Sequence, residues 1–319
     1  MLLQGIILLI SFVVLIKGAD VFVESASSVA KHLNVPDILI GLTIVAFGTS
    51  APEAAVSIKA VLAHNSDIVL GNIVGSNILN ILLILGISSM IAPIHVQSHT
   101  IKKEIPFLLL VSLLLSILLM DTTSGEGTVN MISRMDGIVI LLFFAVFIEH
   151  LITLAQSGQA EEIESKYTFK QAILYTILGL LAIIVGGNFV VSSATAIATA
   201  LGVSQKFIAL TIVALGTSLP ELVTSIAAAQ KGKQDLAIGN VIGSNIFNIC
   251  FVAGFPAAFI GNIIPSSPVI IDLMIMLLAT LMLFFFSYTK KKITKLEGIS
   301  FLLVFVVYYG YLIISQIKS

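Results

Sequence analysis

The sequence is poor in charge. Only 10% of its 319 residues are charged, whereas about a quarter of an ordinary soluble domain is. Lys and Arg number 16 against 17 Asp and Glu, so there is no basic excess to attract nucleic acid. Hydrophobic residues make up 58% of the chain. These proportions exclude a soluble enzyme, a nucleic-acid-binding protein and a disordered chain. They predict an all-α polytopic membrane protein, because helices satisfy their own backbone hydrogen bonds in lipid.

Cysteine is also scarce. The one cysteine, Cys250, lies inside an apolar run, so an internal disulfide is excluded. No basic residue precedes the first apolar run, and no small-residue cleavage site follows it. We therefore expect this run to be retained as the first span and not removed as a signal peptide.

Long apolar runs are what the sequence has in abundance. A span needs about 20 mainly apolar residues, and the chain offers ten candidates. They cover about 2–30, 36–62, 68–92, 104–120, 135–155, 169–200, 205–229, 236–262, 268–287 and 298–316. The connections between them are short, which leaves no room for a separate soluble domain.

The distribution of basic residues orients these spans. With the N-terminus outside, eleven lysines fall in cytoplasmic connections, and four basic residues fall at or near the outer ends. The eleven are Lys31, Lys102, Lys103, Lys166, Lys170, Lys231, Lys233, Lys290, Lys291, Lys292 and Lys295. This is the direction that the positive-inside rule requires. We predict a multi-pass protein of the cell membrane with both termini outside.

An internal duplication is the most informative feature. Residues 41–86 and 209–254 align without a gap at a constant offset of 168 and share 23 identities in 46 positions. The matches include Gly, Thr, Ser, Pro, Glu, Asp and Asn, which lipid-facing helices do not need. The offset also pairs Gly18 with Gly186, upstream of the two matched segments.

The duplication divides the chain into two halves of five spans. The halves are 1–155 and 169–319, joined by a short cytoplasmic loop at 156–168. Because five is odd, the two copies enter the membrane from opposite sides. The sequence therefore predicts two inverted five-helix repeats with a substrate site at the midplane between them, as in many secondary transporters.

Each copy carries the run Gly-Thr-Ser-x-Pro-Glu, at Gly48 to Glu53 and at Gly216 to Glu221. The prolines, Pro52 and Pro220, lack an amide hydrogen and should break the helix, which frees carbonyl oxygens in mid-membrane. The Thr and the Glu are four residues apart and share a helix face. Carboxylate, hydroxyl and carbonyl oxygens are ligands for Na+ or Ca2+ and not for Zn2+ or Cu+.

A second run, Gly-Asn-x-x-Gly-Ser-Asn-x-x-Asn, occurs at Gly71 to Asn80 and at Gly239 to Asn248. The Ser and the last Asn share a face in each copy: Ser76 with Asn80, and Ser244 with Asn248. One such run alone could be interhelical packing. A Glu inside a span is different, because burying a carboxylate costs about 2.5–3.5 kcal/mol or more. Two Glu at equivalent positions favour a cation site. Glu149 and His150, near the end of the fifth span, need only reach the interface.

These paired motifs resemble those of the sodium/calcium exchanger family in the Ca2+/cation antiporter superfamily, in its short prokaryotic form, over nearly the whole chain. The resemblance implies that Glu53 and Glu221 are the central carboxylates shared by Ca2+ and Na+. It implies that hydroxyl and backbone oxygens come from Thr49, Ser50, Thr217 and Ser218. It implies that the carbonyls of Ala46 and Ala214 line the Na+ sites, with Ser76 and Ser244 beside them. Asn80 and Asn248 match the last polar position of each repeat. It also implies that the first and sixth spans move the gate.

One position departs from part of that family. Its potassium-dependent branch has Asp where this chain has Asn248, and that carboxylate is associated with K+ co-transport. Asn leaves two carboxylates in the site and argues against K+ dependence. The long regulatory loop of the animal exchangers is also absent.

The charge balance supports exchange. Two ionised glutamates balance one Ca2+ or two Na+, so the ions compete for the same oxygens, and competition with alternating access gives Na+-driven Ca2+ antiport. An H+-coupled cation antiporter on the same scaffold is the main alternative, followed by a cation channel. An intramembrane enzyme lacks support, since there is no His-rich metal motif and no Asp dyad. We expect Ca2+ and Na+ as substrates within a lipid bilayer, and no cofactor, nucleic acid or protein partner.

Overall fold

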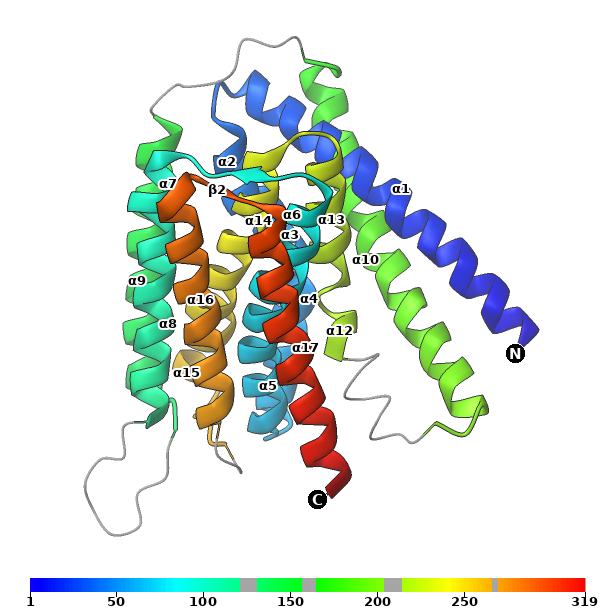
Figure 1. Ribbon diagram of the computed structural model, residues 1–319, viewed down its shortest axis with the longest axis vertical. Coiled ribbons are helices and arrows are strands. Elements are labelled where there is room, and N and C mark those ends of the chain that lie inside the picture. Colours follow the sequence, from blue (N-terminus) through cyan, green and yellow to red (C-terminus); the bar gives the residue numbers. More distant parts are fainter. Residues whose placement is uncertain (121–130, 157–164, 204–213, 266–268, 319) are drawn as a thin grey trace.

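The computed structural model describes residues 1–120, 131–156, 165–203, 214–265 and 269–318. It is a bundle of helices, with two long helices, α1 (Leu2–His32) and α10 (Phe169–Ala200), packed together and running obliquely along one side (Figure 1). Both are rich in exposed apolar side chains, as expected of helices that face lipid.

The expected spans match the observed helices closely. Among the described residues, eight helical stretches are long and apolar enough to cross a membrane. A ninth stretch is a pair of helices, Asp37–Thr49 and Ala51–Leu62, bent by 45° at the break between them. These nine coincide with nine of the ten predicted ranges. The remaining one, 205–229, lies partly outside the described residues, so the total of ten stays a prediction.

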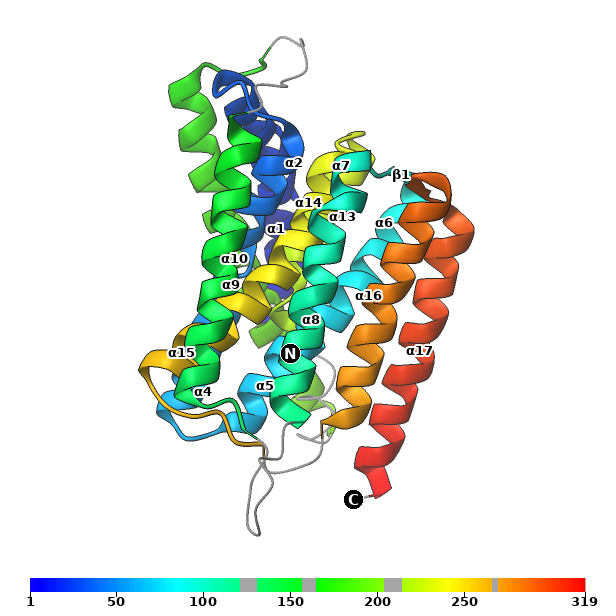
Figure 2. The same ribbon diagram turned by 90° about the vertical axis from the view of Figure 1, so that its left-hand side faces the viewer.

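The peripheral elements cover a core made of the duplicated segments (Figure 2). They are α7 (Ser98–Lys102), α8 (Glu104–Met120), α9 (Arg134–Ala155), α16 (Ile270–Lys290) and α17 (Lys295–Lys318). Two short antiparallel strands pair at one end of the bundle. They are β1 (Ile94–His95), which precedes α7, and β2 (Lys292–Ile293), which lies between α16 and α17.

The duplicated segments form the core. The first copy comprises α2 (Asp37–Ile40), the π-helix η1 (Gly41–Val45), α3 (Ala46–Thr49), α4 (Ala51–Leu62), α5 (Ser66–Ile78), the π-helix η2 (Leu79–Leu85) and α6 (Gly86–Ile91). The second comprises α12 (Ala214–Gly216), α13 (Leu219–Gln230), α14 (Gln234–Phe247), the π-helix η4 (Asn248–Ala253) and α15 (Gly254–Phe259).

The two copies share their local backbone geometry. The residue before the proline-containing helix has φ −86° and ψ 6° at Ser50, and φ −87° and ψ 5° at Ser218. The π-helices η2 and η4 occupy nearly equivalent positions and begin two and three residues after the Gly-Ser-Asn runs. The copies run in opposite directions: α5 leads up to α6, whereas α14 leads down to α15 (Figures 1 and 2). The matched helices α5 and α14 therefore share local geometry at their ends and run in opposite directions.

Glycine allows the two copies to approach closely. A Cβ placed on Gly239 of α14 would lie 2.9 Å from the carbonyl oxygen of Ile38 and 3.0 Å from the Cα of Gly41. Real Cβ atoms do not approach so closely. The backbone of α14 thus rests directly on α2 and η1.

We expect Gly239→Val to destabilise the protein, because the new side chain must push α14 away from α2 and η1. Overpacking of this kind costs about 1–3 kcal/mol. The measurement is the thermal unfolding temperature of the purified protein in detergent. Gly310→Val in α17 is the control, since no described atom lies within 4 Å of a Cβ there. Equal unfolding temperatures for the two variants would contradict the proposed close packing.

Ion pairs tie α1 to the rest of the protein at one end of the bundle. Lys231, which follows α13, lies 2.9 Å from Glu24 and 3.4 Å from Asp20 of α1. Lys166 also pairs with Glu24, at 2.5 Å, and this hydrogen bond raises the pKa of Lys166 above its usual value. Both lysines therefore stay charged at neutral pH and hold this end of α1.

The opposite end lacks these charges. Adding or subtracting the offset of 168 leads from Asp20, Glu24 and Lys231 to Asn188, Ser192 and Ala63. None of these three side chains is ionisable, so this ion-pair cluster is not repeated at the equivalent positions of the other copy.

Candidate cation site

The candidate site forms where two helices break. Ser50 separates α3 from α4 and Ser218 precedes α13, and the proline stands in the first turn of each new helix. Proline suits that position because the first-turn amides have no partner within the helix. Glu53 and Glu221 also lie in the first turn. There the positive end of the helix dipole favours a carboxylate.

Both glutamates are buried. Glu53 and Glu221 are each only 1% exposed, although glutamate side chains are usually found at the surface. Seven further predicted polar residues and one alanine are buried as well: Thr49, Ser50, Ser76, Asn80, Ser218, Ser244, Asn248 and Ala46. Thr217 is partly buried. Ala214 begins α12, and its side chain lies outside what the structure describes.

Hydrogen bonds between the copies bring these residues together. The Ser50 hydroxyl donates to Oε1 of Glu221 at 2.8 Å. In the reverse sense, Ser218 donates to the Ser76 hydroxyl at 3.3 Å. Ser244 donates to the carbonyl oxygen of Ala46 at 3.4 Å. Residues of the first copy thus complete the surroundings of residues in the second.

Several buried oxygens have no hydrogen-bond partner within the described part of the chain. They are both carboxylate oxygens of Glu53, Oε2 of Glu221, and Oδ1 of Asn80 and Asn248. Thr217 and Ser218 lie beside the Glu53 carboxylate, and Glu53 is near enough to Glu221 for their charges to interact. Buried acceptors without donors are costly, and a cation would satisfy them.

Helix packing directs these oxygens to one region. The Glu53 helix, α4, packs on η4, which begins at Asn248. Likewise α13, which carries Glu221, packs on η2, which holds Asn80. Each carboxylate helix therefore contacts the π-helix of the opposite copy. Ca2+ takes six to eight oxygen ligands in flexible geometry, and the donor set here consists of such oxygens.

Sequence reasoning missed a pair of asparagines that position the glutamates. Asn72 donates to the Glu53 carbonyl at 3.0 Å and to the Ser57 hydroxyl at 2.9 Å. Asn240 does the same in the second copy, to the Glu221 carbonyl at 3.3 Å and a serine hydroxyl at 2.8 Å. Both asparagines and both serines are identical between the copies, and that identity was the available signal.

Three asparagines, Asn77, Asn80 and Asn245, also link the copies. Asn80 donates its amide to Oδ1 of Asn245 at 2.8 Å, and Asn245 donates to the carbonyl of Asn77 at 3.2 Å. The hydrogen bond from its amide nitrogen to Asn245 fixes the orientation of the Asn80 side chain and leaves Oδ1 as the atom that can accept a hydrogen bond or bind an ion. The last Asn of the first motif is therefore oriented by the second copy.

The chain also matches known proteins over almost its full length. A family model described as "Sodium/calcium exchanger protein" matches residues 3–153 and 171–314. This chain belongs to the sodium/calcium exchanger family. It is thus a membrane transporter of the antiporter type and not an enzyme. The expected resemblance is confirmed.

Similar proteins and a similar solved structure cover most of the chain. The inner membrane protein YrbG of Escherichia coli is 36% identical over 81% of this chain and 80% of its own. The sodium/calcium exchanger MaX1 of Methanosarcina acetivorans is 31% identical over 95% of this chain and 96% of its own. A structure of the sodium-calcium exchanger NCX_Mj, soaked with Na+ and Sr2+, superposes with a TM-score of 0.83 at 33% identity, covering 97% of this chain and 99% of that one.

Proposed function

We propose that this protein exchanges Na+ for Ca2+ across the membrane, without K+, by alternating access at a buried site centred on Glu53 and Glu221. The observation that carries the proposal is the pair of buried carboxylates at equivalent positions of the two copies. Their unpartnered oxygens belong to the donor class that Na+ and Ca2+ prefer. The names of MaX1 and NCX_Mj support the same pair of ions.

Charge makes this site an exchanger. Two carboxylates in a low-dielectric interior are costly until a cation compensates them, so the loaded forms are the ones able to change conformation. One Ca2+ neutralises both charges, and so do two Na+. Because both loads need the same oxygens, one must leave before the other binds, and this couples their movements.

The proposed ligands come from both copies. Besides the glutamates, they are the hydroxyl or backbone oxygens of Thr49, Ser50, Thr217 and Ser218, the carbonyls of Ala46 and Ala214, and the side chains of Ser76, Ser244, Asn80 and Asn248. The hydrogen bonds between Ser50 and Glu221 and between Ser76 and Ser218 support shared use of these residues.

The proposed architecture is two inverted five-helix halves, 1–155 and 169–319, with ten spans and both termini outside. The opposite directions of α5 and α14 support inversion. Most of the connecting loop at 156–168 lies outside the described residues. Helix α1 packs on α13, and α10 packs on α3 and α13. The two long helices therefore contact helices of the site, which fits a gating role.

Reconstituted vesicles test this proposal. Vesicles containing the purified protein are loaded with Na+ and diluted into Na+-free buffer with radiolabelled Ca2+. We expect Ca2+ uptake that collapses when the Na+ gradient is abolished and is unchanged by adding K+. Gradients of Na+, K+ and H+ are then imposed one at a time. Uptake driven by a pH gradient without Na+ would replace Na+ coupling with H+ coupling, and conductance without any counter-ion would indicate a channel.

The serines of the two breaks should differ in importance despite their identical motif positions. The Ser50 hydroxyl donates directly to Glu221, whereas the Ser218 hydroxyl lies beside Glu53 but donates to Ser76. A hydrogen bond to a charged group contributes about 1.5–3 kcal/mol, so Ser50→Ala should weaken Ca2+ binding about tenfold or more. Ser218→Ala is the matched control, with a smaller loss expected. Calorimetric Ca2+ titration of both variants measures the difference, and equal losses would contradict this reading of the contact.

A further inference from the structure

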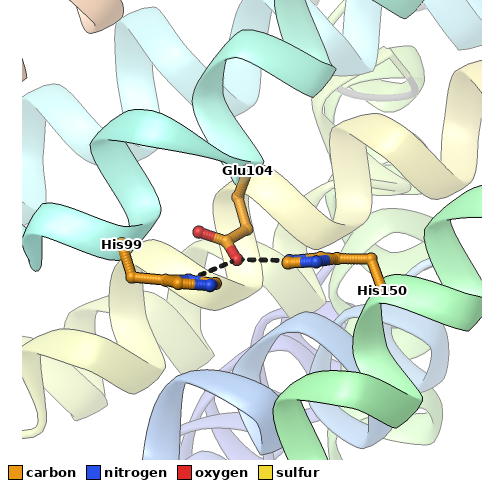
Figure 3. A group of neighbouring side chains, drawn as sticks. All are labelled: His99, Glu104 and His150. Carbon is orange, nitrogen blue, oxygen red and sulfur yellow. Dashed lines mark hydrogen bonds and ion pairs between the residues drawn. The ribbon is translucent and has the colours of Figure 1, made fainter.

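A second group of possible metal ligands lies away from the candidate cation site, at one end of the helix bundle. Glu104 is the first residue of α8, and His99 lies in the preceding short helix α7. His150 belongs to α9. The chain bends between α7 and α8 at Lys103, and this bend brings His99 and Glu104 to the same side (Figure 3).

The three side chains converge on one carboxylate oxygen. Oε1 of Glu104 lies 3.0 Å from Nδ1 of His99 and 2.6 Å from Nε2 of His150. The two imidazole rings are nearly parallel, with 9° between their planes. Figure 3 shows the carboxylate between the edges of the two rings. All three ligand atoms lie within 4.8 Å of one another.

Burial makes this more than a surface cluster. The Glu104 side chain is 0% exposed, and its second oxygen, Oε2, has no hydrogen-bond partner within the part of the chain described. A buried carboxylate oxygen without a donor is costly. The histidines are 43% and 24% exposed, so an ion can reach the carboxylate past them.

We propose that His99, Glu104 and His150 bind a transition-metal dication of the Zn2+ class. Two imidazoles and one carboxylate are the donors that Zn2+ takes when three protein ligands leave the fourth position to water. Donors around a tetrahedral Zn2+ lie about 3.3 Å apart, given bonds of about 2 Å. Small movements of the partly exposed histidines reach that spacing. The oxygen-rich site around Glu53 and Glu221 suits hard cations instead.

Such an ion would join α8 to α9. Helix α9 also packs on η4 and α15, which carry Asn248 and Gly254, the last residue of the second duplicated segment. The ion would therefore hold two peripheral helices together beside the core. This consequence is structural, so stability reports on it independently of transport.

Cobalt provides a direct test, because four-coordinate Co2+ with nitrogen and oxygen ligands absorbs visible light strongly. The native protein is purified in detergent, freed of metal, and titrated with Co2+ in the presence of excess Ca2+, which occupies any site of hard oxygen donors. We expect visible bands that saturate at one ion per chain, are displaced by Zn2+, and accompany a rise in unfolding temperature.

Variants decide which residues bind the ion. His99→Gln and His150→Gln should each weaken Co2+ binding by about tenfold or more, whereas His64→Asn, at an exposed turn, should leave it unchanged. Glu104→Gln should remove the bands, and its unfolding temperature without metal shows whether it still folds. The proposal is overturned if the folded native protein gives no bands, or if both histidine variants keep them.

Discussion

Glu53→Gln and Glu221→Gln should each abolish Na+-driven Ca2+ uptake. Each substitution removes one of the two negative charges that the proposed site uses to balance Ca2+. Removing one partner of a buried ion pair costs about 3–5 kcal/mol, which corresponds to a loss of about two to three and a half powers of ten in Ca2+ affinity. Uptake at micromolar Ca2+ should therefore fall to the level of empty vesicles.

The control for this pair is Glu149→Gln. Glu149 is exposed near the end of α9 and accepts a hydrogen bond from the Thr153 hydroxyl. The substitution makes the same chemical change outside the site, so uptake should be preserved. Glutamine is close in size to glutamate, and the variants should therefore fold, which gel filtration and unfolding temperature verify. Full uptake by both Glu53→Gln and Glu221→Gln would show that the site is wrongly assigned.

Much of the fold was predictable because its signals are local. A run of apolar residues predicts a span, and nine expected ranges coincide with observed helices. Proline predicts a helix break without reference to any other segment, and the break at Ser50 is present where expected. The duplication predicted equivalent structure at an offset of 168, as the matching angles at Ser50 and Ser218 illustrate.

Contacts between distant segments were not predictable in the same way. The hydrogen bond from Ser50 to Glu221 joins residues 171 positions apart, and only the packing of the two copies decides it. The π-helices at the end of the second motif have no compositional signal that distinguishes them from an α-helix. His150 was expected only to reach the interface, and sequence reasoning missed that its Nε2 bonds to the buried Glu104. That contact was missed because the partner lies on another helix.

Asn248→Asp should make Ca2+ transport depend on a further monovalent cation. Asn248 is fully buried at the start of η4, and both polar atoms of its side chain lack a partner among the described residues. An ionised aspartate would change the net charge of the site's side chains from −2 to −3, so that one Ca2+ alone would no longer neutralise it. An uncompensated buried charge costs about 2.5–3.5 kcal/mol, and transport without compensation should slow about a hundredfold.

Potassium is the cation to test, since the sequence resemblance places Asp at this position in the potassium-dependent branch. We expect K+ to restore uptake by Asn248→Asp while leaving the native protein unaffected. Asn80→Asp, the equivalent change in the first copy, provides the contrast. Asn80 donates its amide to Oδ1 of Asn245, and a carboxylate there would face that oxygen and repel it. Added K+ should therefore not rescue Asn80→Asp.

The outcome distinguishes an aspartate that stays ionised from one that takes up a proton. If the new aspartate stays ionised, K+ stimulation should follow its concentration and saturate. If it takes up a proton instead, as buried carboxyls do when no cation compensates them, uptake should depend on pH and not on K+. Rescue of both variants by K+, or an Asn248→Asp variant that responds neither to K+ nor to pH, would contradict the assignment of Asn248 as the position that sets the site's charge.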